Sequence, residues 1–432
     1  MLPKGWKQVP LHSVAEIRTG LAKGKQGLLD PVELPYLRVA NVQDGHFKLD
    51  EIKTILVERG SIERYTLQLG DVLMTEGGDF DKLGRGAVWR APIAPCLHQN
   101  HVFSVRPKTG ILDSTFLAAL SSSRYGRTYF EGCAKRSTNL ASINSSQLKE
   151  FPIILPPHEE QRAIGRVLDT WDAAIASTEK LLINSRRQKE ALISKLVMPV
   201  PASGRGRSVG DAFPASVQPG IPQLPPTPAG WRKATLGQFL KEVPRPVALE
   251  PDKAYTLITV RRSRGGVDER GVLLGNEIKT PSQFRVKTGD FLISKRQIVH
   301  GACGIVPPNL DGAIVSNEYA VLNTFNGLDT RFLAYLAETT YFQQTCFHSS
   351  IGVHVEKMIF KLDRWLTWPF NIPPVDVQQR IVAQIDLATN QIRSAERQLE
   401  LLKQEKRALM ADLLTGKRRV YAPEISTEAE AT

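Results

Sequence analysis

Apolar residues recur at heptad spacing in two stretches of the chain, residues 155–198 and 372–416. They are spaced mostly by four and three positions, which predicts two long helices, each with the narrow apolar seam of a coiled coil. A Pro-Pro pair precedes each helix and suits a helix start, whereas Pro199 and Gly416 mark the ends. The predicted seam consists of Ile164, Leu168, Trp171, Ile175, Leu182, Leu192, Leu196, Ile381, Ile385, Ile392, Leu399, Leu402, Leu409 and Leu413.

The two helical stretches are copies of one another at a constant offset of 217 residues. Pro156 falls on Pro373 and Gln161 on Gln378, and no gap is needed between them. A match of this length at a fixed offset indicates an internal duplication. Two unrelated amphipathic helices would not be expected to share start, register and length.

The blocks before each helix, residues 1–154 and 230–371, repeat as well. Asn100 matches Asn317 at the offset of 217, whereas Gly70-Asp71 matches Gly289-Asp290 at 219. The changing offset places insertions inside the blocks and none inside the helices. In the first block, turn residues around short mixed runs predict strands at 36–39, 52–57 and 71–74, followed by one helix over 113–129.

These patterns together predict an α+β fold with tandem pseudo-two-fold repeats. Two mixed α/β domains are separated by the two long helices, and a two-fold relation between the halves would make those helices antiparallel. Residues 199–229 are rich in proline and glycine, so we expect an extended or disordered linker there. Residues 417–432 are expected to form a flexible tail.

The charge of the chain favours an anionic partner, with nucleic acid first. Its 56 basic and 44 acidic residues give a formal net charge of +12. A basic surface without any polyanion is the simpler alternative. The four cysteines show no paired spacing, which favours reduced thiols in the cytoplasm. No apolar run is long enough to predict a membrane span.

Motifs for catalysis are not found in the sequence. It lacks a phosphate-binding P-loop, the Asn-Pro-Pro-Tyr or Asp-Pro-Pro-Tyr motif of amino-methyltransferases, and a glycine-rich cofactor loop. Cys96, His98, His101 and Cys133 could be considered metal ligands, but the second block has no matching set. We therefore predict no catalytic residue, no metal and no cofactor in this chain.

Both blocks carry side chains suited to DNA near predicted turns. Arginine and lysine can contact phosphates or guanine, and asparagine can read adenine. Each one alone is better interpreted as a solvated surface residue, so the hypothesis depends on the set. The candidates are Lys23, Lys25, Arg38, Asn41, Lys82, Arg85, His98, Asn100, Arg136, Asn139, Arg261, Arg262, Arg264, Lys295, Arg296, His300, Asn317 and His354.

Taken with the Gly-Trp entry at Trp6 and Trp231, the repeat resembles the specificity subunit of type I restriction-modification systems. The segment Leu155-Pro-Pro-His-Glu-Glu-Gln161-Arg162 carries much of this resemblance, and Gly70-Asp71-Val72-Leu73 adds to it. The Pro-rich linker departs from the family pattern and leaves the start of the second domain open.

The resemblance implies that the blocks are two target-recognition domains, each reading one half of a split sequence in double-stranded DNA. It also implies that the helices pack antiparallel as a spacer and bind two modification subunits, which restriction subunits then join. S-adenosylmethionine, ATP and Mg²⁺ would be bound by those partners. The alternative is a coiled-coil scaffold protein without sequence-specific DNA binding.

Overall fold

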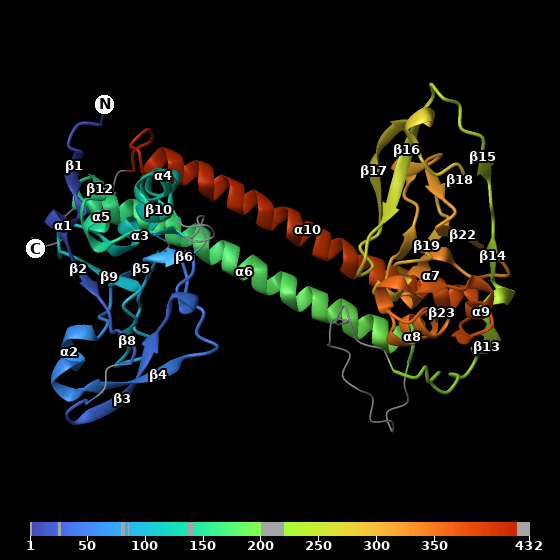
Figure 1. Ribbon diagram of the computed structural model, residues 1–432, viewed down its shortest axis with the longest axis horizontal. Helices are drawn as coiled ribbons and strands as arrows, with labels where there is room; N and C mark the ends of the chain where they lie inside the picture. The colour runs from blue at the N-terminus through green and yellow to red at the C-terminus, as the bar shows by residue number, and fades with distance from the viewer. Residues whose placement is uncertain are drawn as a thin grey trace, which may run out of the picture. The chain divides into compact units, whose positions relative to one another are not determined.

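The computed structural model describes residues 2–24, 27–78, 83–84, 86–136, 141–199 and 220–420. Its contacts divide the chain into two compact units, Met1–Glu179 with Arg397–Thr432, and Lys180–Glu396. Each unit contains one mixed domain and one part of each long helix (Figure 1).

The two long helices are α6 (His158–Leu196) and α10 (Val375–Leu413), each of 39 residues. Both their starts and their ends are related by the 217-residue offset. The Pro-Pro pairs lie just before the first turns. Acidic residues follow in those turns, where the helix dipole favours negative charge.

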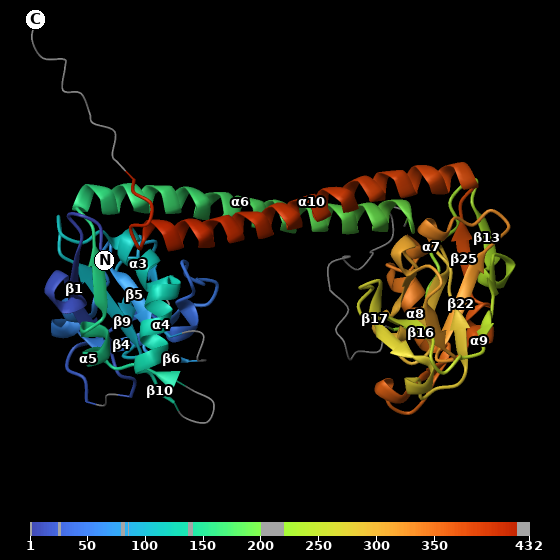
Figure 2. The same ribbon diagram turned by 90° about the horizontal axis from the view of Figure 1, so that it is seen from above.

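Within each unit the segments of α6 and α10 run antiparallel. In the first unit Lys403 pairs with Glu179 at 2.7 Å, and Lys406 pairs with Asp172 at 2.5 Å. Residue numbers therefore increase along α10 in the direction in which they decrease along α6. In the second unit Arg186 pairs with Glu396 at 2.8 Å. That pair is the Lys403–Glu179 pair shifted by 217 residues, as a pseudo-two-fold relation requires. Figure 2 shows both helices from above.

All of the predicted seam residues are buried or half-buried. Ile164, Leu168 and Leu413 belong to the core of the first unit, whereas Ile381 and Ile385 belong to that of the second. The remaining seam residues are fully or partly shielded: Trp171, Ile175, Leu182, Leu192, Leu196, Ile392, Leu399, Leu402 and Leu409.

The domain of the first unit contains small sheets and short helices. Its four-stranded sheet has the order β2 (Ala15–Thr19), β9 (Val102–Pro107), β5 (Val72–Thr75), β7 (Gly86–Val88). A three-stranded sheet has the order β4 (Lys53–Glu58), β3 (Pro31–Leu37), β8 (Leu97–His98), and another β10 (Lys135–Arg136), β11 (Ala141–Ser142), β6 (Gly77–Gly78). β1 (Lys7–Pro10) pairs with β12 (Pro152–Leu155). The helices are α1 (Leu11–Val14), α2 (Ile62–Tyr65), α3 (Ser114–Ser122), α4 (Arg124–Cys133) and α5 (Ser145–Lys149).

The domain of the second unit follows the same plan with a larger outer sheet. Its four-stranded sheet has the order β14 (Leu240–Glu242), β22 (Tyr319–Thr324), β19 (Phe291–Ser294), β20 (Cys303–Ile305). The five-stranded sheet has the order β15 (Pro246–Val247), β18 (Gln283–Arg285), β21 (Ile314–Ser316), β16 (Ala254–Val260), β17 (Val267–Leu274). β13 (Arg232–Thr235) pairs with β25 (Pro369–Ile372), and β23 (Ser350–Ile351) with β24 (Ile359–Phe360). The helices are α7 (Thr330–Leu336), α8 (Thr340–His348) and α9 (Leu362–Trp365).

Strand register is repeated between the domains. Leu73 of β5 lies opposite Ser104 of β9, and the equivalent Leu292 of β19 lies opposite Val321 of β22. The α+β class, the two mixed domains and the two long helices are therefore confirmed.

A buried glutamine ties each long helix to its domain. The Gln161 side chain accepts from the Asp113 N–H at 2.9 Å and donates to the carbonyls of Ile111 and Pro156. Gln378 makes the matching bonds to Asp329, Gly327 and Pro373. Since buried backbone groups need partners, these two amides fix the start of each helix against the domain.

The single helix predicted over 113–129 is wrong: the chain forms α3 and α4, with a break at Ser123. Ser123 is extended, with ψ of 167°, and its hydroxyl accepts from the Gly126 N–H at 3.3 Å. Serine competes in this way for backbone hydrogen bonds and favours a helix start over a helix interior.

Both segments expected to be flexible contain residues that pack on a domain. Arg419 makes a bidentate ion pair with the buried Glu160 at 2.6 and 2.8 Å, so residues 417–420 differ from the expected free tail. In the linker, Asn371 donates to the Pro225 carbonyl at 3.0 Å, and Leu224 packs against the second core. Residues 200–219 and 421–432 lie outside the described part of the chain.

Candidate nucleic-acid interfaces

Three loops of the second domain come together and carry most of its predicted DNA-binding residues. The Ser263 N–H donates to the His300 carbonyl at 2.7 Å, and the Arg264 N–H donates to the Gly301 carbonyl at 3.0 Å. Glu356, in the loop between β23 and β24, pairs with Arg262 at 3.2 Å and lies 3.2 Å from His300 Nε2. The structure thereby gathers Arg261, Arg262, Arg264, Lys295, Arg296, His300 and His354 on neighbouring loops.

The first of these loops has an unusual backbone. Ser263 and Arg264 both have positive φ, at 55° and 59°. Side-chain-bearing residues rarely adopt this region, and strained residues cluster at functional sites. Arg264 donates from Nε to the Ala337 carbonyl at 3.0 Å, so part of its guanidinium serves to hold the loop.

Both domains have the same pair of backbone hydrogen bonds beside these loops, which we call the backbone junction. In the second domain the Lys295 N–H donates to the Glu318 carbonyl at 2.8 Å, and the Phe360 N–H donates to the Lys295 carbonyl at 2.8 Å. Asn317 is the exposed residue directly before Glu318 in the turn that leads into β22. Lys295 Nζ also donates to the Asn317 carbonyl at 3.2 Å.

The first domain makes the same junction with different side chains. The Glu76 N–H donates to the His101 carbonyl at 3.0 Å, and the Ile143 N–H donates to the Glu76 carbonyl at 2.8 Å. Asn100 therefore occupies the position of Asn317. His101 Nδ1 lies 2.5 Å from the Glu76 carboxylate, whereas the second domain has lysine and glutamate at these two positions. The same backbone arrangement thus carries different side chains in the two domains, with the carboxylate at opposite positions.

Two predicted residues of the first domain are internal. Asn41 is 3% exposed; its amide donates to the carbonyls of Lys48 and Glu51 at 2.9 Å each. His98 is 1% exposed, and its Nδ1 donates to the Val102 carbonyl at 2.7 Å. Burial lowers the pKa of His98 below its ordinary value. Both side chains are therefore placed to hold loops rather than to face a ligand.

The other candidates of the first domain are described only in part. Lys25, Lys82, Arg85 and Asn139 lie outside the described residues, and Arg136 is described only as part of strand β10. Arg38 is half-buried and lies 3.4 Å from the Glu51 carboxylate.

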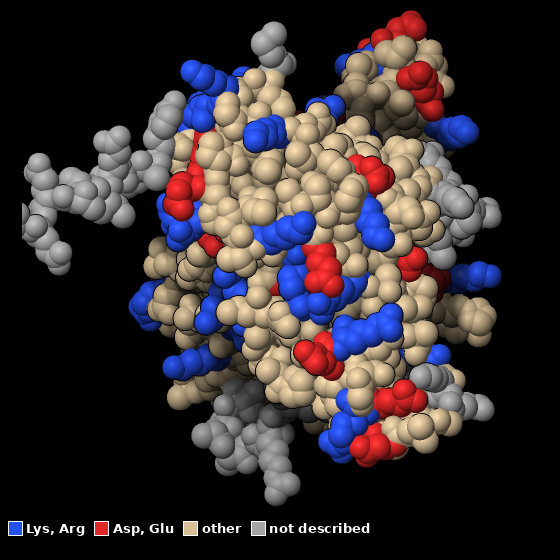
Figure 3. All heavy atoms as spheres, turned by 90° about the vertical axis from the view of Figure 1, so that its left-hand side faces the viewer, with Lys and Arg blue, Asp and Glu red and all other residues tan. Residues whose placement is uncertain are grey.

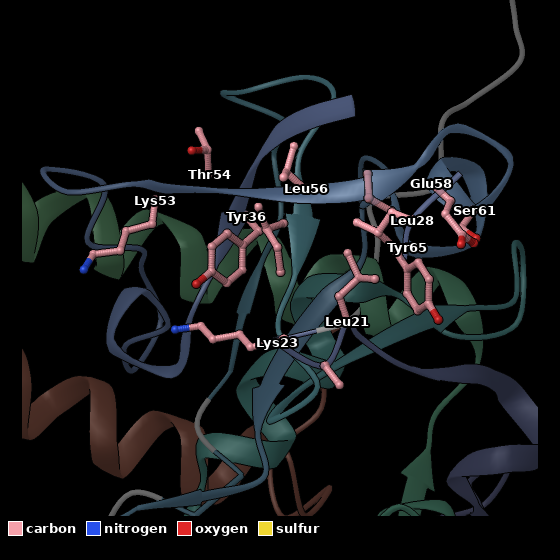
Figure 4. Close-up of a pocket in the computed structure, with 14 residues that line it drawn as sticks. Leu21, Lys23, Leu28, Tyr36, Lys53, Thr54, Leu56, Glu58, Ser61 and Tyr65 are labelled. Atoms are coloured by element: carbon pink, nitrogen blue, oxygen red, sulfur yellow. The ribbon is translucent and has the colours of Figure 1, made fainter. Parts of the chain in front are cut away.

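Lys23 lines a surface pocket of about 900 Å³ beside the β3–β4 hairpin. Figure 4 shows Lys23 and Lys53 extending toward the same side as the Tyr36 hydroxyl, whereas Glu58 and Ser61 lie at the other end near Tyr65. The Lys23 ammonium lies 5.8 Å from the centre of the Tyr36 ring. The residues that line this pocket are apolar or carry charges of both signs. They form no arrangement of acid, base and nucleophile that would support catalysis.

Charges of both signs are interspersed around the candidate residues. Arg262 pairs with Glu356, and Arg296 with Glu318 at 2.5 Å. Figure 3 shows a face of the first unit on which lysine and arginine are dispersed among acidic and uncharged residues. A phosphate approaching the second domain would compete with carboxylates for these guanidinium groups, which favours a geometrically defined contact over diffuse attraction.

The described residues contain no candidate metal centre, and two of their cysteines are poor nucleophiles. In that part of the chain no cluster of three His, Cys, Asp or Glu side chains could hold a metal ion. Burial raises the pKa of the Cys96 and Cys303 thiols to about 12 in each case, which makes them poor nucleophiles. None of the described helices is both long and apolar enough to cross a membrane.

The sequence reasoning missed the apolar part of the second interface. Ile351 and Val353, in and after β23, are 46% and 95% exposed. Gln343 was also missed; it is buried and donates to the carbonyls of Ile298 and Val299 at 2.9 and 2.7 Å. The glycine within Ile351-Gly-Val-His354 could have indicated a turn with an exposed apolar tip, but nothing local predicts the role of Gln343.

Comparison with known proteins finds similarity to one class of protein. Residues 3–184 match the family model for the type I restriction modification DNA specificity domain. The chain is also 26% identical over 435 aligned residues to the type I restriction enzyme MjaX specificity subunit of Methanocaldococcus jannaschii, covering 97% of this chain and 95% of that protein. The chain is thus similar over nearly its whole length to a type I restriction enzyme specificity subunit, in agreement with its sequence resemblance.

Other relatives match only part of the chain. The EcoKI specificity subunit of Escherichia coli is 25% identical over 199 residues, which cover 43% of this chain and 42% of that protein. Two solved structures share the fold. One, from a study of complex assembly and conformational transition of the type I R-M system, has a TM-score of 0.57 at 17% identity and covers 97% of this chain and all of that one. The S subunit from M. genitalium has a TM-score of 0.54 at 13% identity, covering 96% and 97%.

Proposed function

We propose that this chain is the DNA sequence-specificity subunit of a type I restriction-modification complex and is itself not catalytic. Each mixed domain reads one half of a bipartite site in double-stranded DNA. The observation that carries this proposal is the shared backbone junction at Asn100 and Asn317, which holds different side chains in the two domains. Such an arrangement suits two readers built on one frame, each with its own sequence preference.

In this proposal the long helices act as the spacer between the readers and as the docking surface for two modification subunits. Those subunits would bind S-adenosylmethionine, and restriction subunits using ATP and Mg²⁺ would join the complex on cytoplasmic DNA. The regular antiparallel pairing of α6 and α10 within each unit supports a rigid spacer. Exposed apolar residues on the helices, such as Leu181 and Leu387, are available for docking.

The experiment is an exchange of the first domain. Residues 8–150 are replaced by the matching block of another family member, and the gene is expressed with its modification partner. Long-read sequencing then maps methylated DNA. We expect one half of the methylated sequence to change and the other to remain. Changes in both halves would contradict modular reading, and a methylome that does not depend on this gene would favour the scaffold alternative.

A further inference from the structure

The loop between β23 and β24 in the second domain presents an apolar tip. Val353 is 95% exposed, and Ile351 and Ile359 at the base of the loop are 46% and 40% exposed. Scattered exposed aliphatic residues are common on protein surfaces. Here, however, three of them share one short hairpin, and that hairpin stands next to the arginine-bearing loop.

The tip is folded tightly rather than loosely. The Lys357 N–H donates to the His354 carbonyl at 2.8 Å, and the Met358 N–H donates to the Val355 carbonyl at 3.2 Å. At Gly352 a Cβ atom would come within 2.8 Å of the Met358 Cα, so the two sides of the loop approach as closely as glycine allows. The loop therefore holds the Val353 side chain outward in a defined position.

The tip is also braced against the neighbouring loops. Glu356 pairs with Arg262 at 3.2 Å and lies 3.2 Å from His300. Val353 is thus fixed relative to basic groups that could contact phosphates. A loop that contacted only phosphates would have no use for an aliphatic tip, whereas base edges offer one apolar group in the major groove, the methyl group of thymine.

The matching hairpin of the first domain carries different chemistry. With Ile143 equivalent to Phe360 at the backbone junction, the strand pairing makes Lys135 equivalent to Ile351, so the first domain has Lys135-Arg136 where the second has Ile351-Gly352, directly before Val353. Arginine is the residue that most often reads guanine, whereas aliphatic side chains contact the thymine methyl group. The two domains thus differ at this hairpin in the way that two different half-sites require.

We propose that Val353 contacts the 5-methyl group of a thymine in the half-site read by the second domain and contributes to its sequence preference. This inference depends on the proposed function. It deepens that function by naming a residue and the chemical group that it reads.

The test uses the full-length chain in complex with its modification subunits. DNA duplexes carrying the mapped target are made with each thymine of the second half-site replaced in turn by deoxyuridine, which lacks only the methyl group. We expect one replacement to lower the methylation rate of the wild-type complex about fourfold, the effect expected for losing one buried methyl group. Val353→Ala should lose about as much on thymine DNA and lose nothing further at that one deoxyuridine.

Val353→Thr keeps the shape of the side chain and should show an intermediate loss, which guards against a folding defect. Val272→Ala is the matched control, because Val272 is an exposed valine of the same domain, in β17. We expect this control to keep the wild-type response to every deoxyuridine. The inference is overturned if no deoxyuridine affects the wild-type complex, if Val353→Ala is silent, or if its loss multiplies with that of every deoxyuridine. A wild-type complex without any sequence-specific methylation would instead overturn the proposed function, and the inference with it.

Discussion

Asp71 and Asp290 occupy the same position in the two domains, yet the arginines that bind them come from different places in the chain. Asp71 accepts from Arg106 of β9 at 2.7 and 2.8 Å. Asp290 accepts from Arg245, in the segment between β14 and β15, at 2.6 and 3.1 Å. The residue equivalent to Arg106 is Asn323, which donates to the same Asp290 carboxylate. In both domains the buried aspartate thus has a bidentate arginine partner, but the arginine comes from a different segment of the chain in each domain.

This relationship predicts that the two arginine positions can replace one another. Arg245→Ala leaves the buried Asp290 without its guanidinium and should lower the free energy of unfolding by about 3 kcal/mol. Adding Asn323→Arg should restore much of that loss, because position 323 is where the first domain carries its arginine. Thermal unfolding of the single and double variants measures both effects. A double variant less stable than Arg245→Ala would show that the two frames are not interchangeable.

Buried His98 predicts a pH dependence of stability. Burial lowers the pKa of His98, so the folded state disfavours the proton that the unfolded chain accepts. Above the unfolded pKa of about 6.5, His98 therefore does not lower the free energy of unfolding. As the pH falls below that value, the free energy of unfolding decreases by up to about 1.4 kcal/mol per pH unit.

His98→Gln, which keeps a donor for the Val102 carbonyl, should therefore show a smaller fall in melting temperature between pH 8 and pH 5.5 than the wild type. His46→Gln serves as the control, since His46 is an exposed histidine of the same domain. Equal pH profiles for wild type and His98→Gln would mean that other groups govern acid stability.

The long helices were predictable because their signals are local and repeated. Heptad spacing, the Pro-Pro starts and the constant offset all lie in consecutive residues, and α6 begins three residues after the predicted start at 155. Strands β4 and β5 lie within one residue of the predicted 52–57 and 71–74. β3 was harder, because it begins at Pro31, well before the predicted 36, and proline is a weak strand signal.

The candidate interface was less predictable, because a polar residue near a turn can either bond to the backbone of its own domain or face a ligand. Asn41 and Arg262 look alike in sequence, each a polar residue beside a turn. Asn41 is buried and bonds to backbone carbonyls, whereas Arg262 is exposed and paired with Glu356 from another loop. Whether such a residue is buried or exposed depends on backbone groups that are distant in sequence. Its burial could therefore be assigned only from the structure. The roles of the candidates in DNA binding stay predictions.

Asn100 and Asn317 should each affect one half-site. Both lie at the turn of the shared junction, where an amide can read adenine. Asn317→Ala should lower methylation of targets through the second half-site about tenfold and leave the preference at the first half-site unchanged, and Asn100→Ala should do the converse. Competition between duplexes mutated in one half-site measures this. Asn309→Ala, at another exposed turn of the second domain, is the matched control; loss of folded protein without altered preference would assign the asparagines a structural role.

The spacing of the two half-sites should follow the length of α6 and α10. Lys189 and Lys406 are equivalent residues near the seam, and each is held by a carboxylate, Glu338 at 3.0 Å and Asp172 at 2.5 Å respectively. Glu338 belongs to the second domain, so its contact ties α6 to that domain, whereas the Lys406–Asp172, Arg186–Glu396 and Lys403–Glu179 pairs join the two helices and fix their register. An insertion that preserves heptad spacing should keep that register, whereas four or five residues would rotate the seam.

We therefore predict the outcome of inserting seven residues after Leu182 and another seven after Leu399, the equivalent positions between the Arg186–Glu396 and Lys403–Glu179 pairs. Seven helical residues add about 10 Å. This length corresponds to about three base pairs at about 3.4 Å each. It also turns one half-site about the DNA axis by a quarter to a third of a turn, since a turn takes about 10–10.5 base pairs. The variant complex should methylate the same half-sites with a longer spacer and at a reduced rate. A variant with four inserted residues at each position should lose stability and serves as the control for register. If the seven-residue variant stays active on the original spacer, the helices bind partners but do not set the distance.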